Sequence, residues 1–251
     1  MKNLKKENQQ SRKMKRLKID ILTLFPEFFE SPFSVSMMKR AVENGTIELG
    51  LHQIRDFGLG NRRQVDDSPY GGGAGLIMKP EVITAAWEAL PKTEKTITIV
   101  MSPRGKLFNQ QKAVEFSETA EHLIFVCGHY EGIDQRFIDI SGAMELSVGD
   151  YVLTGGETAA LSVIDAITRL IPGVLGNEES FKNESFSLPL LEHDQYTMPR
   201  VFRGLAIPKV LLGGNHAKIE AWRLRNALAK TAENRPDLLS KIPPAFWEEM
   251  K

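Results

Sequence analysis

The chain has 251 residues, of which 42% are hydrophobic, 25% charged and 8% aromatic, a composition that excludes a fibrous or wholly disordered protein. Its 32 Lys and Arg balance 32 Asp and Glu, and its single cysteine, Cys127, excludes an internal disulfide framework or a cysteine-rich zinc site. No stretch approaches the roughly 20 apolar residues that span a bilayer, so we expect a cytoplasmic protein with no membrane segment.

Positive charge is concentrated at two places in the chain. Residues 1–18 hold eight Lys and Arg against one Glu, and residues 200–235 hold eight against two. The first cluster lies in a polar tail, residues 1–16, which we expect to be disordered; translation from Met14 would remove most of it. The second cluster indicates either a nucleic-acid contact or simply a solvated helix face.

The first part of the chain alternates between apolar strand-like runs and amphipathic helices. We expect strands at 19–25, 47–54, 96–103 and 123–128, and a strand followed by a turn at 145–157. We expect helices at 33–44, 80–90, 109–121 and 158–171. Strands that alternate with helices in this way predict an α/β fold with a parallel sheet.

Three further segments complete the predicted organisation. Residues 55–76 form a long loop with six glycines, and such a loop inside a compact domain is either functional or disordered. We expect a catalytic domain at 17–176, a linker at 177–199 and a smaller helical domain at 200–251. The smaller domain should contain a basic helix at 214–232, capped by Asn215, and a short helical end.

The familiar catalytic motifs are missing from the sequence. There is no G-x-G-x-x-G after a strand, no phosphate-binding G-x-x-x-x-G-K-[ST], no H-E-x-x-H and no G-x-S-x-G. What remains is a set of three glycine-bearing turns, SPRG (102–105), CGHYEGID (127–134) and VGDYVLTGGE (148–157). Each follows a predicted strand, where ligands bind in open parallel sheets, although any one alone is typical of an ordinary turn.

These turns belong to a longer series of motifs that resembles a known family. VDDSPYGGGAG, CGHYEGID, VGDYVLTGGE and IPGVLG occur in this order, as in the bacterial tRNA (guanine-N1)-methyltransferases of the SPOUT class. The likeness runs from about residue 17 to residue 235. It implies a SPOUT-type parallel sheet with a C-terminal trefoil knot, a small helical C-terminal domain, and a homodimer whose active site lies between subunits.

The resemblance also implies the reaction and its cofactor. The expected activity is methyl transfer from S-adenosylmethionine to N1 of the guanine at position 37 of tRNA, next to the anticodon. The residues that would bind the cofactor are carried over from the matching motifs: Met101, Ser102, Pro103, Gly128, Tyr130, Glu131, Val148, Gly149, Asp150, Tyr151, Val152, Leu153, Gly155 and Gly156. Tyr130 and Tyr151 have an alternative interpretation as core aromatic residues.

Methylation of guanine N1 needs a base and a cation. The base removes the N1 proton, and the cation stabilises negative charge that moves to O6. In the family the base is an aspartate in an Asp-Ser-Phe segment; here Glu184 stands at that position, before Ser185 and Phe186. Glu184 is therefore either the base or an exposed linker carboxylate. A second departure lies nearby, where the family has Leu-Leu-Asp and this chain has Leu-Leu-Glu, ending at Glu192.

The remaining predicted site residues also follow from the resemblance. Arg169 is carried over as the cation near O6, with a helix-terminal charge as its alternative. Asp66 is expected either to contact the substrate guanine or to form an Asx turn. Glu131 and Glu184 are the proposed ligands of a magnesium ion. Five residues are expected to contact the anticodon arm of tRNA: Asn215, His216, Lys218, Arg223 and Arg225.

Two other functions remain open at this point. One is a ribose 2′-O-methyltransferase of the same fold. The other is a non-catalytic RNA-binding homologue, favoured only by the replacement of aspartate by Glu184. The affinity for S-adenosylmethionine separates an active enzyme from the non-catalytic homologue.

Overall fold

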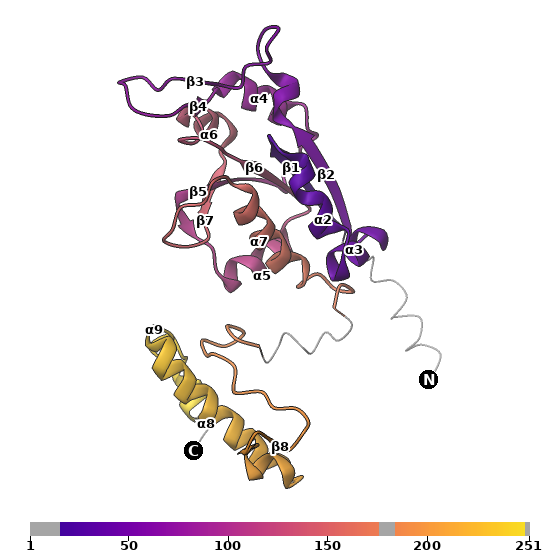
Figure 1. The fold of residues 1–251 in the computed structure, drawn as a ribbon, viewed down its shortest axis with the longest axis vertical. Helices are drawn as coiled ribbons and strands as arrows, with labels where there is room; N and C mark the ends of the chain where they lie inside the picture. The colour runs from indigo at the N-terminus through magenta and orange to yellow at the C-terminus, as the bar shows by residue number, and fades with distance from the viewer. Residues whose placement is uncertain (1–15, 176–183, 249–251) are drawn as a thin grey trace. The chain divides into compact units, whose positions relative to one another are not determined.

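The computed structural model describes residues 16–175 and 184–248 (Figure 1). The predicted disordered tail therefore lies outside the described residues except for Arg16, whose guanidinium pairs with Glu48 at 2.6 Å. The chain divides into two compact units, residues 1–176 and 177–251.

The first unit is built on a five-stranded parallel sheet. Its strands are β1 (Leu17–Thr23), β2 (Ile47–Gln53), β5 (Thr96–Leu107), β6 (His122–Cys127) and β7 (Met144–Ser147). They lie in the order β2-β1-β6-β5-β7, and every neighbouring pair is parallel. The predicted α/β parallel sheet is thus confirmed; the trefoil knot stays a prediction.

Helices cover both faces of this sheet, because side chains alternate between faces along each strand. On one face, Ile19 and Phe125 pack with α2 (Glu30–Phe33), α3 (Ser36–Glu43), α5 (Gln110–Thr119) and α7 (Glu157–Thr168). On the other face, Leu22 and Ile124 pack with α4 (Pro80–Glu88) and α6 (Gln135–Ser141). Two buried cores therefore hold the sheet between two helical layers (Figure 1).

Some element boundaries differ from the predicted ones for identifiable reasons. The helix expected at 33–44 is interrupted, with the 3₁₀ helix η1 (Pro26–Phe29) before α2 and α3. Helix α7 ends at Thr168 instead of residue 171, because Pro172 disfavours a helical residue before it. The chain continues in a tighter turn, in which the Leu170 N–H donates to the Ile167 carbonyl at 3.0 Å and the Ile171 N–H donates to the Thr168 carbonyl at 3.1 Å.

Helix α6 is an element that the sequence analysis missed. Asp134 caps its start by accepting a bond from the Arg136 N–H at 2.9 Å, and Gly142 ends it in the left-handed conformation at φ +64°. Its seven residues are too few to show a clear helical period. The small hairpin of β3 (Asp66–Asp67) and β4 (Ile77–Met78), and the 3₁₀ helix η2 (Ile54–Phe57), were missed as well.

The second unit centres on α8 (His216–Asn234). The predicted cap is confirmed, since Asn215 Oδ1 accepts a bond from the Lys218 N–H at 3.1 Å. The unit's other elements are β8 (Val201–Phe202), β9 (Leu205–Ala206), η4 (Lys209–Leu212), α9 (Pro236–Leu239) and α10 (Pro244–Glu248).

The described part of the predicted linker, residues 184–199, packs on α8. The Leu191 N–H donates to Thr231 Oγ1 at 2.9 Å, and the Asp194 N–H donates to Asn226 Oδ1 at 2.7 Å. The Trp222 ring contacts the rings of His193 and Tyr196, with centroids 6.1 Å apart in both pairs. Trp222 therefore anchors this segment to the helix.

Within the described ranges, no helix is long and apolar enough to cross a membrane.

Candidate functional site

The three glycine-bearing turns lie together at the carboxyl edge of the sheet. Residues Met101 and Lys106 of β5 both pair with Leu146, so the intervening SPRG segment bulges out of the sheet beside the end of β7. The turns after β6 and β7 are joined directly, because the Gly156 N–H donates to the Gly128 carbonyl at 3.0 Å. The sheet thus brings the predicted cofactor-binding segments to one place.

Close backbone packing explains two glycines of these turns. A Cβ on Gly156 would lie 2.8 Å from the Cα of Cys127, and a Cβ on Gly105 would lie 2.4 Å from the Glu145 backbone. No real Cβ approaches a backbone atom so closely, so only glycine fits. These positions serve the packing of the turns on one another, whatever ligand the turns bind.

The long glycine-rich loop reaches the same edge through the β3–β4 hairpin. The Met78 N–H donates to the Gly132 carbonyl, and the Glu131 N–H donates to the Leu76 carbonyl, both at 3.0 Å. Gly75 has φ +83°, and a Cβ there would lie 2.4 Å from Glu131 Oε1. The loop and the CGHYEGID turn therefore form one continuous layer over the ends of the strands.

Tyr130 stands in this layer and is not a core residue. Its side chain is 51% exposed and its backbone has φ +59°, a conformation that is rare for a bulky residue and marks a strained turn. Partial burial of the hydroxyl, together with the neighbouring Asp66 carboxylate, raises the pKa of Tyr130, while Arg55 acts in the opposite sense. Asp66, Tyr130 and Arg55 thus meet in one polar group.

Neither aspartate of the Asp-Asp-Ser-Pro segment forms an Asx turn, in which the side chain accepts a bond from the N–H two residues on. Pro69 has no N–H to donate to Asp67, and the Ser68 N–H donates to Asp67 and not to Asp66. Asp67 Oδ1 accepts a bond from the Ser68 N–H at 2.9 Å, and Lys79 Nζ contacts Asp67 Oδ2 at 2.7 Å. These bonds hold the pKa of Asp67 below its usual value. Asp66 pairs with Met78 in the hairpin, and its carboxylate lies close enough to the Tyr130 hydroxyl to raise the pKa of Tyr130.

Among the other predicted cofactor residues, some side chains are buried in the core and others are exposed to solvent. Met101 is buried and pairs with Cys127 within the sheet, so its side chain belongs to the core. Tyr151 is 57% exposed, and its hydroxyl donates to the Val148 carbonyl at 3.2 Å, folding the ring over its own turn. Exposed side chains on these turns are Pro103, Glu131, Asp150, Val152 and Leu153.

A buried polar cluster at this edge was missed by the sequence analysis. The Glu157 carboxylate, 4% exposed, accepts a bond from Thr23 Oγ1 at 2.5 Å, and His129 Nε2 lies 2.9 and 2.8 Å from its two oxygens. The His129 ring also meets Phe25 edge to face, with centroids 4.9 Å apart. The only sequence feature that indicates this cluster is a glutamate directly after the Gly-Gly pair, at the first position of a helix.

Cys127 lies next to this cluster but is not a nucleophile. Its complete burial raises the pKa of the thiol well above its ordinary value, and the nearby Glu157 carboxylate raises it further. The thiol is therefore protonated at neutral pH.

The two predicted catalytic residues lie in different units of the chain. Arg169 is half-buried directly after α7, whereas Glu184 opens a turn in which its carbonyl accepts a bond from the Ser187 N–H at 3.1 Å. Helix α7 starts at the carboxyl edge, so Arg169 lies at the helix's far end, roughly 18 Å away along an axis that rises about 1.5 Å per residue. The described residues contain no group of three His, Cys, Asp or Glu placed to hold a metal ion.

All five residues predicted to contact tRNA are exposed, at the start and along the first turns of α8. They differ in their partners. Arg223 pairs with Glu220 at 2.7 Å, and Arg225 donates to the Ala221 carbonyl at 3.2 Å. Asn215 is occupied as the helix cap. Lys218 forms no side-chain ion pair with any of the residues that the structure describes.

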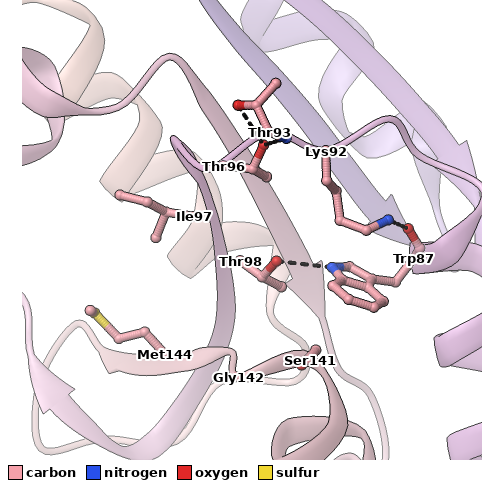
Figure 2. A pocket seen from close by; sticks show the side chains of 9 residues that line it. All are labelled: Trp87, Lys92, Thr93, Thr96, Ile97, Thr98, Ser141, Gly142 and Met144. Atoms are coloured by element: carbon pink, nitrogen blue, oxygen red, sulfur yellow. Dashed lines mark hydrogen bonds between the residues drawn. The ribbon is translucent and has the colours of Figure 1, made fainter.

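A pocket of about 330 Å³ lies at the opposite, amino edge of the sheet and contains none of the predicted site residues (Figure 2). Its polar groups bond one another: Trp87 Nε1 donates to Thr98 Oγ1 at 2.9 Å, and Lys92 Nζ donates to the Trp87 carbonyl at 2.6 Å. Because these groups already have partners, the pocket offers few free hydrogen-bonding groups to a ligand. The carboxyl edge remains the candidate site.

Comparisons with known proteins agree on one family. The family model described as tRNA (Guanine-1)-methyltransferase TrmD matches residues 17–241. Among curated proteins, the tRNA (guanine-N(1)-)-methyltransferases of Staphylococcus aureus strains JH9, Newman and USA300 are each 53% identical over 227 residues. These matches cover 90% of this chain and 92% of each relative.

Proposed function

The chain belongs to the tRNA (guanine-1)-methyltransferase family, and from this premise we propose that it methylates N1 of the guanine at position 37 of tRNA, next to the anticodon. Methyl transfer to N1 of a tRNA guanine is the family's activity, and S-adenosylmethionine as the methyl donor follows from it. The observation that best supports the site is the meeting of the three glycine-bearing turns at the carboxyl edge of the sheet.

The residues at this edge fit S-adenosylmethionine chemically. The turn after β7 exposes Val152 and Leu153, 83% and 39%, which suit the flat apolar adenine ring. Glu131 and Asp150 are exposed carboxylates on the same turns, and they suit the cofactor's positive charges. When bound, the cofactor supplies an electrophilic methyl group on a sulfonium. The protein must therefore bind it, exclude water and aim the methyl group.

The chain's own residues must activate guanine, whose N1 is a poor nucleophile while it is protonated. We propose that the Glu184 carboxylate accepts the N1 proton and that the Arg169 guanidinium stabilises the negative charge on O6. Asp66, beside Tyr130 in the layer over the strands, would contact the guanine after it leaves its stack. A magnesium ion held by Glu131 and Glu184 remains a proposal, without support from a ligand cluster among the described residues.

The position of Arg169 supports a composite active site. Arg169 lies at the end of α7 that is remote from the cofactor turns of its own chain. Arg169 and these turns are therefore too far apart to contact the same guanine. We therefore propose a homodimer, in which a second copy of the chain brings the missing groups to each cofactor site. The trefoil knot and a second unit that binds the anticodon arm are part of the same proposal.

The two alternative functions gain no support from the relatives. The Staphylococcus aureus relatives are named as guanine-N(1) methyltransferases, and this name argues against methylation of a ribose hydroxyl. It argues equally against a homologue that has lost catalysis.

The proposal is tested by methyl transfer from labelled S-adenosylmethionine to a tRNA that carries guanine at position 37. The product is digested and the modified nucleoside identified, with tRNA carrying adenine at position 37 as the control substrate. We expect N1-methylguanosine from the parent chain and a loss of at least about 100-fold in Glu184→Ala, because general-base catalysis typically contributes that much.

Glu192→Ala is the matched control for Glu184→Ala, since it removes the other linker glutamate. It should leave the rate nearly unchanged. Full activity in Glu184→Ala, with loss in Glu192→Ala, would move the base to Glu192. No methylated guanosine from the parent chain would contradict the proposed function.

A further inference from the structure

The buried cluster of Glu157, His129 and Thr23 occupies a special point of the sheet. Strands β1 and β6 are neighbours, yet the chain leaves β1 toward β2 on one side and leaves β6 toward β7 on the other. Ligands of open parallel sheets bind outside the carboxyl ends of two such strands. Thr23 ends β1, and His129 is the second residue after β6, so Glu157 joins the two strands at this point.

Glu157 also joins two of the cofactor turns to each other. It is the first residue of α7, directly after Gly155 and Gly156, while its partner His129 belongs to the turn after β6. Gly155 makes room for this contact: a Cβ there would lie 2.5 Å from Glu157 Oε2 and 2.5 Å from the His129 ring.

The turn held in this way is the strained one. His129 precedes Tyr130, which has φ +59°, and Gly132 follows with φ +120°. On the other side of the turn, the His129 N–H donates to Met78 Sδ at 3.4 Å and the Glu131 N–H donates to the Leu76 carbonyl. A turn with two unusual backbone conformations keeps its shape only when its surroundings hold it, and Glu157 provides the buried anchor.

We propose that Glu157, through His129 and Thr23, is a positioning residue that holds the turn at 128–132 in the conformation that binds S-adenosylmethionine. The inference rests on the proposed function, because it assumes that this turn forms part of the cofactor site. Glu157 is 4% exposed and acts through its partners without touching the cofactor. Its loss should weaken cofactor binding while leaving tRNA binding intact.

A second buried carboxylate in the same sheet supplies a matched control. Asp20 of β1 is 1% exposed and bonds His52 Nε2 and His122 Nε2, each at 2.7 Å. It resembles the Glu157 cluster in burial and in its histidine partners, but it contacts none of the residues of the cofactor turns. Asp20→Asn should therefore lower the melting temperature without changing the affinity for S-adenosylmethionine.

The experiment titrates the full-length chain with S-adenosylmethionine in a calorimeter and measures the melting temperature of each variant. The variants are Glu157→Gln, Thr23→Val and the conservative Thr23→Ser, with Asp20→Asn as control. We expect the dissociation constant to rise about tenfold in Glu157→Gln and Thr23→Val, since small misplacements of binding groups have effects of this size or larger. Thr23→Ser keeps the hydroxyl and should bind like the parent.

Steady-state kinetics give a second readout that a purely structural role would not produce. In Thr23→Val the KM for S-adenosylmethionine should rise while the KM for tRNA stays the same. Thr23→Val keeps the shape of the side chain, so it serves if Glu157→Gln fails to fold. Parent-like affinity in Thr23→Val, or an equal loss of affinity in Asp20→Asn, would overturn the inference. Failure of the parent chain itself to bind S-adenosylmethionine would overturn the proposed function and this inference with it.

Discussion

The three histidines of the first unit belong to two clusters, each built around one buried carboxylate, and the two clusters have different expected roles. Glu157 connects the cofactor turns, whereas Asp20 connects strands β1, β2 and β6 within the sheet. Gly50 is needed beside Asp20, because a Cβ there would lie 2.0 Å from Asp20 Oδ1. The Asp20 cluster therefore belongs to the stability of the fold, and its contribution can be measured separately.

Replacing Asp20 should destabilise the protein strongly. Asp20→Ala leaves the buried His122 and the partly buried His52 and Lys18 without their common partner, and breaking a buried ion pair from one side costs about 3 kcal/mol. Chemical denaturation monitored by circular dichroism measures the free energy of unfolding. The control is Asp56→Ala, which breaks an exposed pair with Arg63 and should cost less than about 1 kcal/mol; equal losses in both variants would contradict the assignment.

The same cluster predicts a dependence of stability on acid pH. Burial alone would raise the pKa of Asp20, but hydrogen bonds from His122, His52 and Lys18 outweigh it and hold the pKa well below its ordinary value of 3.8. Because the folded state binds this proton more weakly than the unfolded state, the stabilisation is complete above about pH 5 and is lost as the pH falls below the unfolded value. Asp20→Ala should therefore flatten the loss of stability between about pH 5 and pH 2.

At the scale of single elements, strong local patterns predicted most of the fold. Strand β6 is buried along its whole length and reads as a continuous apolar run, and α7 shows clear helical spacing. The misses are short: the seven-residue α6 and the two-residue strands of both hairpins. Such elements are fixed by contacts with distant residues, as when Met78 bonds the Gly132 carbonyl, and local sequence carries little trace of them.

The cap of α8 gives a prediction at this scale. Asn215→Ala removes the acceptor of the Lys218 N–H and should destabilise the first turn of the helix by about 1 kcal/mol. Amide hydrogen exchange at residues 216–219 measures the effect, because the amides of the first turn should exchange faster. Asn215→Ser keeps an acceptor at the cap and should retain the protection; unchanged exchange in Asn215→Ala would show that the cap contributes nothing.

At the scale of the whole molecule, we propose that the first unit binds the cofactor and the second unit binds RNA. The cofactor turns all belong to the first unit, and the exposed cations of α8 belong to the second. Binding of RNA phosphates releases condensed counterions, so the affinity for RNA depends on the salt concentration. Binding of a small cofactor releases no such counterions, so its affinity should depend little on salt.

This division predicts different salt responses for the two ligands. The affinity for tRNA should fall steeply with salt, and Lys218→Ala should reduce the slope of log K against log salt by about one unit. Arg223→Ala should change it less, because Arg223 is already paired with Glu220. Filter binding across a salt series measures both slopes. Lys39→Ala, on α3 of the first unit and paired with Glu43, is the control and should leave the slope unchanged.

The sequence by itself determined the parallel α/β architecture, the order of the glycine-bearing turns and the family, because the spacing of apolar residues and the long motifs are local properties of the chain. Only the tertiary structure decided which residues meet. It placed Tyr130 beside Asp66 and Arg55, paired Asp67 with Lys79, and buried Glu157 against Thr23, a residue 134 positions away. Contacts at such separations depend on how strands are ordered in the sheet, which no local pattern encodes.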